Sequence, residues 1–508
     1  MSTIPQSVAD DQQLEQYGYR PRYLRTVRSF ESFAIGFSFI SITTGIFIGF
    51  GFVLNTAGPA GIWTWLIALV GQTLISLICA TLAAKFPLSG YHYQWGTRLA
   101  NPIVGWWLGW LGLTYLTVVV ISVDYAFVQS ALQPMFGLTY TPTSAALLTF
   151  LTVAVQAALI TWSTQITTRI NNAAVVFEVV GIIELAIVLL SAALLASRGN
   201  LGNLTSTGIV PEEGWSRWLG PFMLAATLGA YNLVGFESAA NFSEETQDPR
   251  RTTPKAMVRA VVLSGVLGFI LLATLAIAVG DVKATSEDAS PVAFVLADTL
   301  GPSIEKIFLA FICVSIFCCG MICLATGSRL TWAMARDRRL PGHRFLSRVP
   351  RVTGGPTWAT VAIATVGVLI LLVLRTNTTA LTDLFTASTL SPALLYTATV
   401  LLYAGFSHRV TPEPGYFHLG RWEKPVLAGA FLWLAYELVI LFGPDQFRTA
   451  QTYVAGALVV GVVVFGIMWF LEPAAMRTSA VDERQLELDE LPPDDHDARE
   501  TARTSSMW

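Results

Sequence analysis

Blocks of about twenty apolar residues recur along the whole chain, and they limit its fold more than any other feature. A helix of about that length spans the hydrocarbon core of a bilayer. We place twelve spans, at residues 30–55, 60–84, 102–131, 143–163, 171–197, 217–241, 256–280, 303–328, 357–374, 380–404, 425–443 and 450–471. Only 13% of the residues are charged, whereas soluble proteins average about 25%. The sequence therefore predicts an all-α polytopic membrane protein with twelve transmembrane helices.

The 31 Lys and Arg residues are distributed unevenly between the two sides of this arrangement. Most lie in the tails and in the loops after even-numbered spans, and basic residues concentrate on the cytoplasmic side of membrane proteins. We therefore expect both termini in the cytoplasm. The membrane that we expect the chain to span is the plasma membrane. Residues 1–29 form the N-tail and show no cleavable signal peptide. Residues 472–508 are acidic and contain prolines, and we expect them to be a disordered C-tail.

Several classes of function are excluded by what the chain lacks. The basic residues form no continuous patch for nucleic acid, and there is no Gly-Lys-Ser/Thr loop for phosphate. The histidines lie in loops or the C-tail without a paired nucleophile, so we expect them to be solvated and expect no enzyme: His92, His343, His408, His418 and His496. The cysteines lie in apolar segments without ligand-spaced partners, so we expect no cofactor and no metal site: Cys79, Cys313, Cys318, Cys319 and Cys323.

The first span is interrupted near its middle by Ser41, Thr43, Thr44 and Gly45. A span that only anchors the chain would favour Leu, Ile and Val there, because glycine and small hydroxyl residues favour an unwound turn. We interpret the segment as a broken helix at the bottom of a substrate path. Close helix packing through small residues is the alternative interpretation.

The sixth span carries a matching interruption, where Asn232, Gly235 and Glu237 stand in an apolar helix. This spacing fits the five-plus-five inverted repeat of many secondary transporters. An unwound turn offers N–H groups that suit a carboxylate and C=O groups that suit an ammonium, so two facing breaks suit a zwitterion. Such a plan divides the chain into a first repeat, a second repeat and two additional helices, at residues 30–197, 217–404 and 425–471.

Carboxylates inside the spans are candidates for coupling to an ion gradient. A carboxylate in hydrocarbon is costly and must face a cavity or a partner. We interpret Glu237, beside the second break, as a coupling or site residue, and a hydrogen-bonded structural carboxyl is the alternative. Asp124, Glu184 and Glu437 also lie in spans, and Asp124 is the one expected to face the path.

Several motifs follow one another in the order found in one known superfamily. They are YGYRP at 17–21, TTGIF at 43–47, FPLSGYHYQW at 86–95, GFE at 235–237, EETQDPRRTTPKA at 244–256 and SRLTWAMARDRRLP at 328–341. The sequence resembles the amino acid–polyamine–organocation permeases, and within them the amino acid/choline transporter branch. The resemblance covers nearly all of residues 17–471 and implies a leucine-transporter-like fold with the first and sixth helices broken.

The resemblance also implies a substrate site at the two breaks. Backbone N–H groups around Thr44, Gly45 and Ile46 would hold a carboxylate, and the carbonyls of Ser41, Tyr231 and Val234 would take the amino group. Tyr231 would be an aromatic gate, and Glu237 would link the site to the opening motion. The implied substrate-binding set is Ser41, Thr43, Thr44, Gly45, Ile46, Tyr231, Val234 and Gly235.

Two positions depart from the family pattern. Tyr91 follows Gly90 where the family has a second glycine. Glu178, on the fifth span, stands where several proton-coupled relatives carry a lysine, which puts lysine-based coupling in doubt. We leave three interpretations of Glu178 open: a second proton-linked site, a residue that helps to hold a cation near the first and eighth spans, or a satisfied structural carboxyl.

We therefore expect a secondary active transporter of amino acids that works by alternating access. Proton coupling is the first choice and exchange the second, with sodium as the other coupling ion. A carrier or exchanger of choline, polyamine or 4-aminobutyrate is the alternative, with an aromatic cage formed by Phe47, Phe50, Tyr231 and Phe236. An alternative of another class is a permease-like nutrient sensor. The expected partners are the small-molecule substrate, the coupling ion and membrane lipid, with no nucleic acid.

Overall fold

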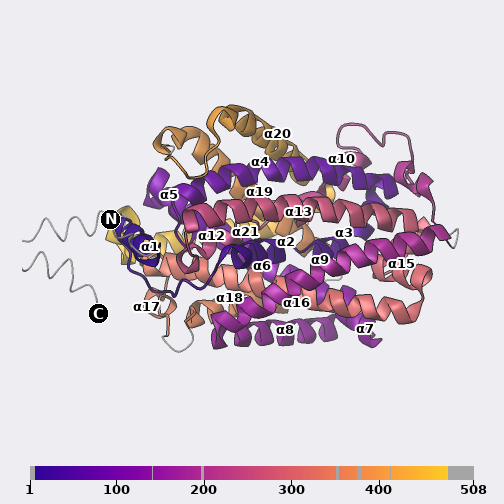
Figure 1. The fold of residues 1–508 in the computed structure, drawn as a ribbon, viewed down its shortest axis with the longest axis horizontal. Helices are drawn as coiled ribbons and strands as arrows, with labels where there is room; N and C mark the ends of the chain where they lie inside the picture. The colour runs from indigo at the N-terminus through magenta and orange to yellow at the C-terminus, as the bar shows by residue number, and fades with distance from the viewer. Residues whose placement is uncertain are drawn as a thin grey trace, which may run out of the picture.

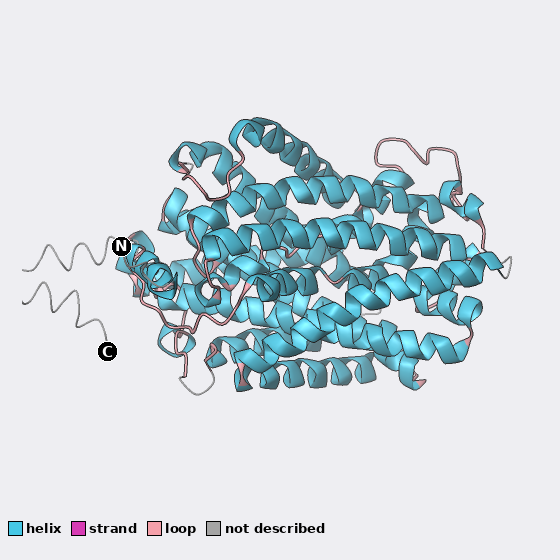
Figure 2. Ribbon diagram, in the orientation of Figure 1, coloured by secondary structure: helices cyan, strands magenta, loops and turns pink. Residues whose placement is uncertain are grey.

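The computed structural model describes residues 6–139, 141–195, 199–350, 354–374, 380–411 and 413–478. Helices make up most of these residues, which contain no strand, only an isolated parallel bridge between Val27 and Thr246 (Figure 2). The predicted all-α membrane fold is confirmed.

Ten helical segments among the described residues are long and apolar enough to cross a membrane. Their main helices are α2 (Ser29–Ile40), α3 (Ile42–Ala57), α4 (Thr64–Lys85), α6 (Pro102–Phe127), α8 (Pro142–Trp162), α9 (Thr164–Leu195), α13 (Pro249–Ala278), α16 (Pro302–Arg336), α19 (Ala380–Phe406), α20 (Glu423–Phe442) and α21 (Arg448–Leu471). The ninth span is the shorter α18 (Thr357–Leu374), and the sixth is divided into α10 (Pro221–Ala225), α11 (Thr227–Asn232) and α12 (Ser238–Asn241). Helices therefore occupy all twelve predicted spans.

The long helices pack in two groups. In the first group α13 lies against α2 and α4, and in the second α16 lies against α6, α8 and α18. α9 contacts α2 and α13 of the first group and α16 of the second, and α2 also contacts α16. Small residues allow the first group to pack closely, since a Cβ at Gly265 would lie 2.1 Å from Leu69 and one at Gly268 would lie 2.4 Å from Trp65.

Short helices lie at the two ends of the bundle (Figure 1). One end carries α1 (Gln6–Gln16), α5 (Tyr91–Leu99) and α17 (His343–Leu346), and the other carries α7 (Gln133–Phe136), α10 and α15 (Pro291–Leu300). We call these the α5 end and the α15 end.

The segments near both chain termini lie at the α5 end. The Tyr17 hydroxyl, just after α1, donates to the Lys85 carbonyl at 2.7 Å. Near the other terminus, α22 (Pro473–Arg477) is held by Arg339, which donates to the Ala475 carbonyl at 2.9 Å and to the Tyr93 hydroxyl at 2.9 Å. The first residues of the expected disordered C-tail are thus helical, and residues 479–508 lie outside the described residues.

Candidate functional site

The first span breaks at Ser41, between α2 and α3. The Ser41 backbone has φ 36° and ψ 96°, in the left-handed half of the map that residues with a side chain rarely adopt. Its N–H still donates to the Phe37 carbonyl at 2.9 Å, and its carbonyl accepts from the Gly45 N–H at 3.2 Å. The two half-helices therefore meet at one residue, and the predicted break is confirmed.

Side chains of the protein itself cap the N-terminus of α3. Ser41 Oγ lies 3.4 Å from the Thr44 nitrogen, as an N-cap acceptor. Glu178 of α9 places Oε1 3.2 Å from the Thr43 nitrogen, 2.9 Å from Thr43 Oγ1 and 3.1 Å from Ser41 Oγ. Ser315 of α16 adds a hydroxyl 3.0 Å from Thr43 Oγ1. A carboxylate is favoured at this position because a helix N-terminus has unpaired N–H groups and partial positive charge.

The second break separates α11 from α12. Gly235 has φ 84°, where a side chain would be strained. The Gly235 N–H donates to the Tyr396 hydroxyl at 3.1 Å, and the Ser238 N–H donates to the Gly235 carbonyl at 2.9 Å. Within the described part of the chain, no hydrogen bond from the protein reaches the carbonyl oxygens of Tyr231 or Val234. The second break therefore keeps two open backbone acceptors.

The two breaks lie against each other. A Cβ built on Gly45 would lie 1.6 Å from Asn232 Oδ1, and one built on Gly235 would lie 1.8 Å from the Phe39 ring. The Ser238 hydroxyl adds a hydrogen bond across the crossing, to the Ile35 carbonyl at 3.4 Å. Glycine is required at both positions because any side chain would push the broken spans apart.

Tyr396 of α19 joins the second break to Glu237. The Tyr396 hydroxyl donates to Glu237 Oε2 at 2.7 Å and accepts from the Gly235 N–H. The Tyr396 ring also stacks on Phe236, with centroids 5.6 Å apart. Glu237 is 1% exposed, so its carboxyl depends on this partner. The sequence analysis missed Tyr396, and a tyrosine in the apolar tenth span was the available signal.

Aromatic residues from three spans meet beside the breaks. The Tyr231 ring lies 4.5 Å from the Phe385 ring of α19, and Phe385 lies 5.7 Å from Phe52 of α3. Tyr231 and Phe236, two of the residues proposed for an aromatic cage, thus contact different rings, Phe385 and Tyr396. Phe385 was not identified from the sequence.

Within the described residues, the other carboxylates singled out in the spans form no hydrogen bond or ion pair with either break. Asp124 Oδ1 accepts from Gln156 Nε2 at 2.7 Å, and a Cβ at Gly320 would lie 2.2 Å from it, so Asp124 lies among α6, α8 and α16. Glu184 is exposed on α9, and Glu437 is buried in α20. Among the residues that the structure describes, no cluster of three or more His, Cys, Asp or Glu side chains could hold a metal ion.

Ion pairs hold the chain beyond the second break to the α5 end. Glu244 Oε2 lies 2.9 Å from Arg336 Nη1, and Glu245 Oε1 lies 2.6 Å from Arg329 Nε. Arg329 and Glu245 are each 2% exposed, so this pair is shielded from solvent. The Val27 N–H, from the segment before α2, donates to the Glu245 carbonyl at 2.9 Å. These contacts tie α16 and the N-tail to the segment that follows α12.

The expectation of solvated histidines is wrong for His92. This side chain is fully buried in α5, with Nδ1 2.7 Å from Thr399 Oγ1 and its ring centroid 5.9 Å from that of Tyr396. Burial lowers the pKa of His92 to about 3, so the imidazole is neutral at physiological pH. His408 and His418 are exposed, and His496 lies outside the described residues.

Comparisons with known proteins agree with this architecture. The sequence profile described as amino acid permease matches residues 29–465. An uncharacterized amino-acid permease of Schizosaccharomyces pombe is 26% identical, over 91% of this chain and 86% of the relative. Amino-acid permease 2 of Neurospora crassa is 24% identical, over 91% and 87%, and amino-acid permease BAT1 of Arabidopsis thaliana is 23% identical, over 92% and 96%.

The matched region runs from the first residue of α2 into α21 and so contains both breaks and the helices that meet there. The chain therefore belongs to the amino acid permease family of the amino acid–polyamine–organocation superfamily, and it is a transporter, not an enzyme.

Proposed function

We propose that the protein transports amino acids across the plasma membrane and binds them where the two breaks cross. The open carbonyl oxygens of Tyr231 and Val234 support this proposal most directly, because unpaired acceptors inside a membrane suit an ammonium group. The Ser41 carbonyl has one protein donor and keeps a lone pair for a second. These three carbonyls form the amino-group site in the proposal.

The substrate carboxylate is assigned to the first turn of α3, at the N–H groups of Thr44, Gly45 and Ile46. The Thr44 N–H has only a long bond, 3.4 Å, to Ser41 Oγ, and a carboxylate is the stronger acceptor. Asn232 now lies against Gly45 and must move aside for a ligand to reach this turn. Thr43 and Gly235 shape the two breaks, and the Tyr231 ring, packed on Phe385, is the gate.

We assign proton coupling to Glu178 and Glu237, because each buried carboxyl is hydrogen-bonded to one break. Protonation would make the Glu178 carboxyl a hydrogen-bond donor, whereas it now accepts hydrogen bonds from Thr43 and Ser41. Protonation of Glu237 would change its hydrogen bond with Tyr396. Alternating access follows if these changes release the α5 end, which we assign to the cytoplasm. Opening there must separate Glu244 from Arg336.

The experiment begins with thermal unfolding of the purified protein against α-amino acids, choline, polyamines and 4-aminobutyrate. Stabilisation by α-amino acids, and not by choline or polyamines, is expected, because choline and polyamines carry no carboxylate for the N–H site. Stabilisation by choline or polyamines alone would contradict the substrate assignment.

Proteoliposomes then test the energy source. Uptake of the best ligand should follow an imposed proton gradient and fail when an ionophore collapses it. Uptake that requires internal amino acid instead would indicate exchange, and uptake that requires external sodium would indicate sodium coupling.

A further inference from the structure

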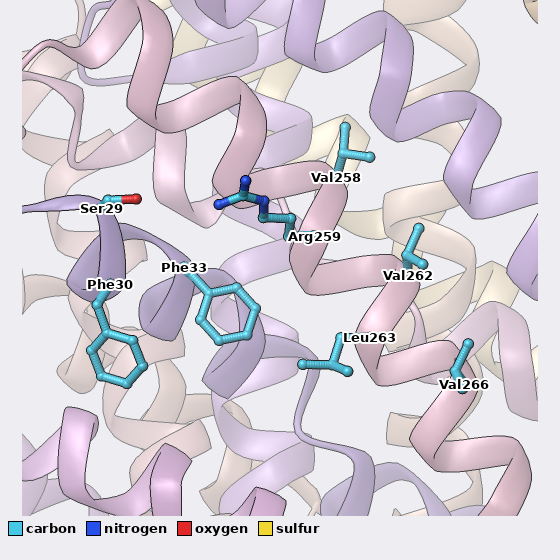
Figure 3. A pocket seen from close by; sticks show the side chains of 8 residues that line it. All are labelled: Ser29, Phe30, Phe33, Val258, Arg259, Val262, Leu263 and Val266. Carbon is cyan, nitrogen blue, oxygen red and sulfur yellow. The ribbon is translucent and has the colours of Figure 1, made fainter.

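A groove of about 800 Å³ lies between α2 and α13 near the α5 end (Figure 3). Phe30 and Phe33 of α2 form one wall, and Val262, Leu263 and Val266 of α13 form the other. Phe30 and Val266 are each 46% exposed, so this apolar surface faces outward from the bundle. In a membrane protein a surface of this kind, inside the span region, faces acyl chains.

One charged side chain breaks the apolar character of the groove. Arg259 lines it, is exposed, and makes no ion pair or hydrogen bond with the protein among the described residues. In Figure 3 its guanidinium extends from α13 toward α2, on the side of Ser29. A charged side chain at a surface that faces acyl chains is costly unless an anion pairs with it.

Along one face of α13, the charged residues and the apolar residues lie in separate parts of the helix. Lys255, Arg259 and Leu263 are spaced four residues apart and therefore share a face of the helix. Lys255 is also exposed and lies nearer the α5 end than Arg259. Going along α13 from the α5 end, the two cationic side chains therefore lie first, and the apolar residues of the groove wall follow toward the membrane centre. A phospholipid has the same order, with a phosphate at one end and acyl chains at the other.

We propose that this groove binds one anionic phospholipid of the leaflet at the α5 end. The phosphate pairs with Arg259, and one acyl chain lies along Phe33, Leu263 and Val266. A guanidinium binds phosphate bidentately, which gives a preference over the surrounding lipid. A second copy of the chain fits the groove less well, because it would have to bury Arg259 without an anion.

The test uses the purified full chain in detergent, with phosphatidylglycerol and phosphatidylcholine of identical acyl chains. Native mass spectrometry measures the bound lipid, and thermal unfolding measures the stabilisation. Phosphatidylglycerol should bind and stabilise the protein more than phosphatidylcholine. Arg259→Gln should weaken phosphatidylglycerol binding about tenfold, whereas Arg344→Gln, the same charge change at an exposed arginine of α17, should leave it unchanged.

Two further measurements separate the contributions of the headgroup and the acyl chain. Val266→Trp fills the groove and should reduce lipid binding while the melting temperature without lipid stays near that of the wild type. Inorganic phosphate at the same concentration should not stabilise the protein. Equal binding of the two lipids, full binding by Arg259→Gln, or stabilisation by phosphate alone would overturn the proposal, as would a dimer that Val266→Trp dissociates.

Discussion

The two breaks look alike in sequence, yet the protein completes them differently. At the first break the donors are occupied, because Ser41 and Glu178 take the N–H groups of Thr44 and Thr43. At the second break the carbonyl oxygens of Tyr231 and Val234 are open, whereas the Gly235 N–H has a partner, the Tyr396 hydroxyl. A ligand would therefore meet unpaired carbonyl oxygens at the second break. At the first break it would meet a helix N-terminus whose N–H groups are already hydrogen-bonded to the protein.

The two breaks also differ in where their buried carboxyl groups come from along the chain. Glu237 belongs to the second break itself and reaches it through Tyr396. Glu178 comes from a different helix, α9, and bonds directly to the first break. A change in its hydrogen bonding would therefore act between spans, whereas a change at Glu237 would act first within its own segment. This difference makes Glu178 the better candidate for linking an ion to the movement of α3 against α9.

The largest effect is expected where the breaks touch. Gly45→Ala would place a Cβ 1.6 Å from Asn232 Oδ1, and Gly45→Leu would be worse, so uptake should fall to background because the broken spans cannot cross. Uptake in proteoliposomes is compared with the amount of protein in the membrane. Gly181→Ala on α9 is the control, since nothing lies within 4 Å of its new Cβ. Normal uptake by Gly45→Ala would show that the close contact of the two breaks is not needed for the substrate site.

The next effect is expected at the first break. Glu178→Gln removes a charged acceptor bonded to Thr43 and Ser41, and hydrogen bonds to charged groups contribute about 1.5–3 kcal/mol each. Uptake should fall about tenfold or more and lose its pH dependence. Glu184→Gln, an exposed change on the same helix, should transport normally.

The same pair of variants separates the three interpretations of Glu178. Loss of pH dependence supports a proton-linked site, and loss of sodium dependence supports a cation site. A lower melting temperature with both dependences intact would show a structural carboxyl.

A smaller effect is expected at the second break. Tyr396→Phe leaves the Gly235 N–H and Glu237 without their shared partner, at a cost of about 1–3 kcal/mol, so uptake should fall several-fold. Tyr453→Phe, at a partly exposed tyrosine of α21, is the control. Glu237→Gln should change the pH profile of uptake. A profile identical to that of the wild type would exclude Glu237 from coupling.

The smallest effect concerns His92, whose ring lies beside Tyr396. Its pKa is lowered from 6.5 to about 3, so the unfolded chain takes up a proton first as the pH falls. Stability should therefore be unaffected above pH 6.5 and decrease below it, by about 2 kcal/mol at pH 5. His92→Gln should flatten this acid limb in thermal unfolding measured from pH 8 to 5. An unchanged limb would mean that other groups cause it.

The sequence alone determined the properties that depend on neighbouring residues. Apolar blocks of the right length predicted twelve spans, since a bilayer requires each backbone polar group to be satisfied within its own helix. Clusters of small and polar residues at Ser41 and Gly235 predicted the breaks, because those residues weaken a helix wherever it lies.

Tertiary structure alone decided what completes each break. Glu178 lies 137 positions from Ser41, and Tyr396 lies 161 positions from Gly235, so no local pattern could pair them. His92 was expected in solvent because it was placed in a loop without a paired nucleophile, but α5 packs against α6 and α19 and buries it. The sequence shows where a polar residue stands in a span, and the packing of distant helices decides what it meets there.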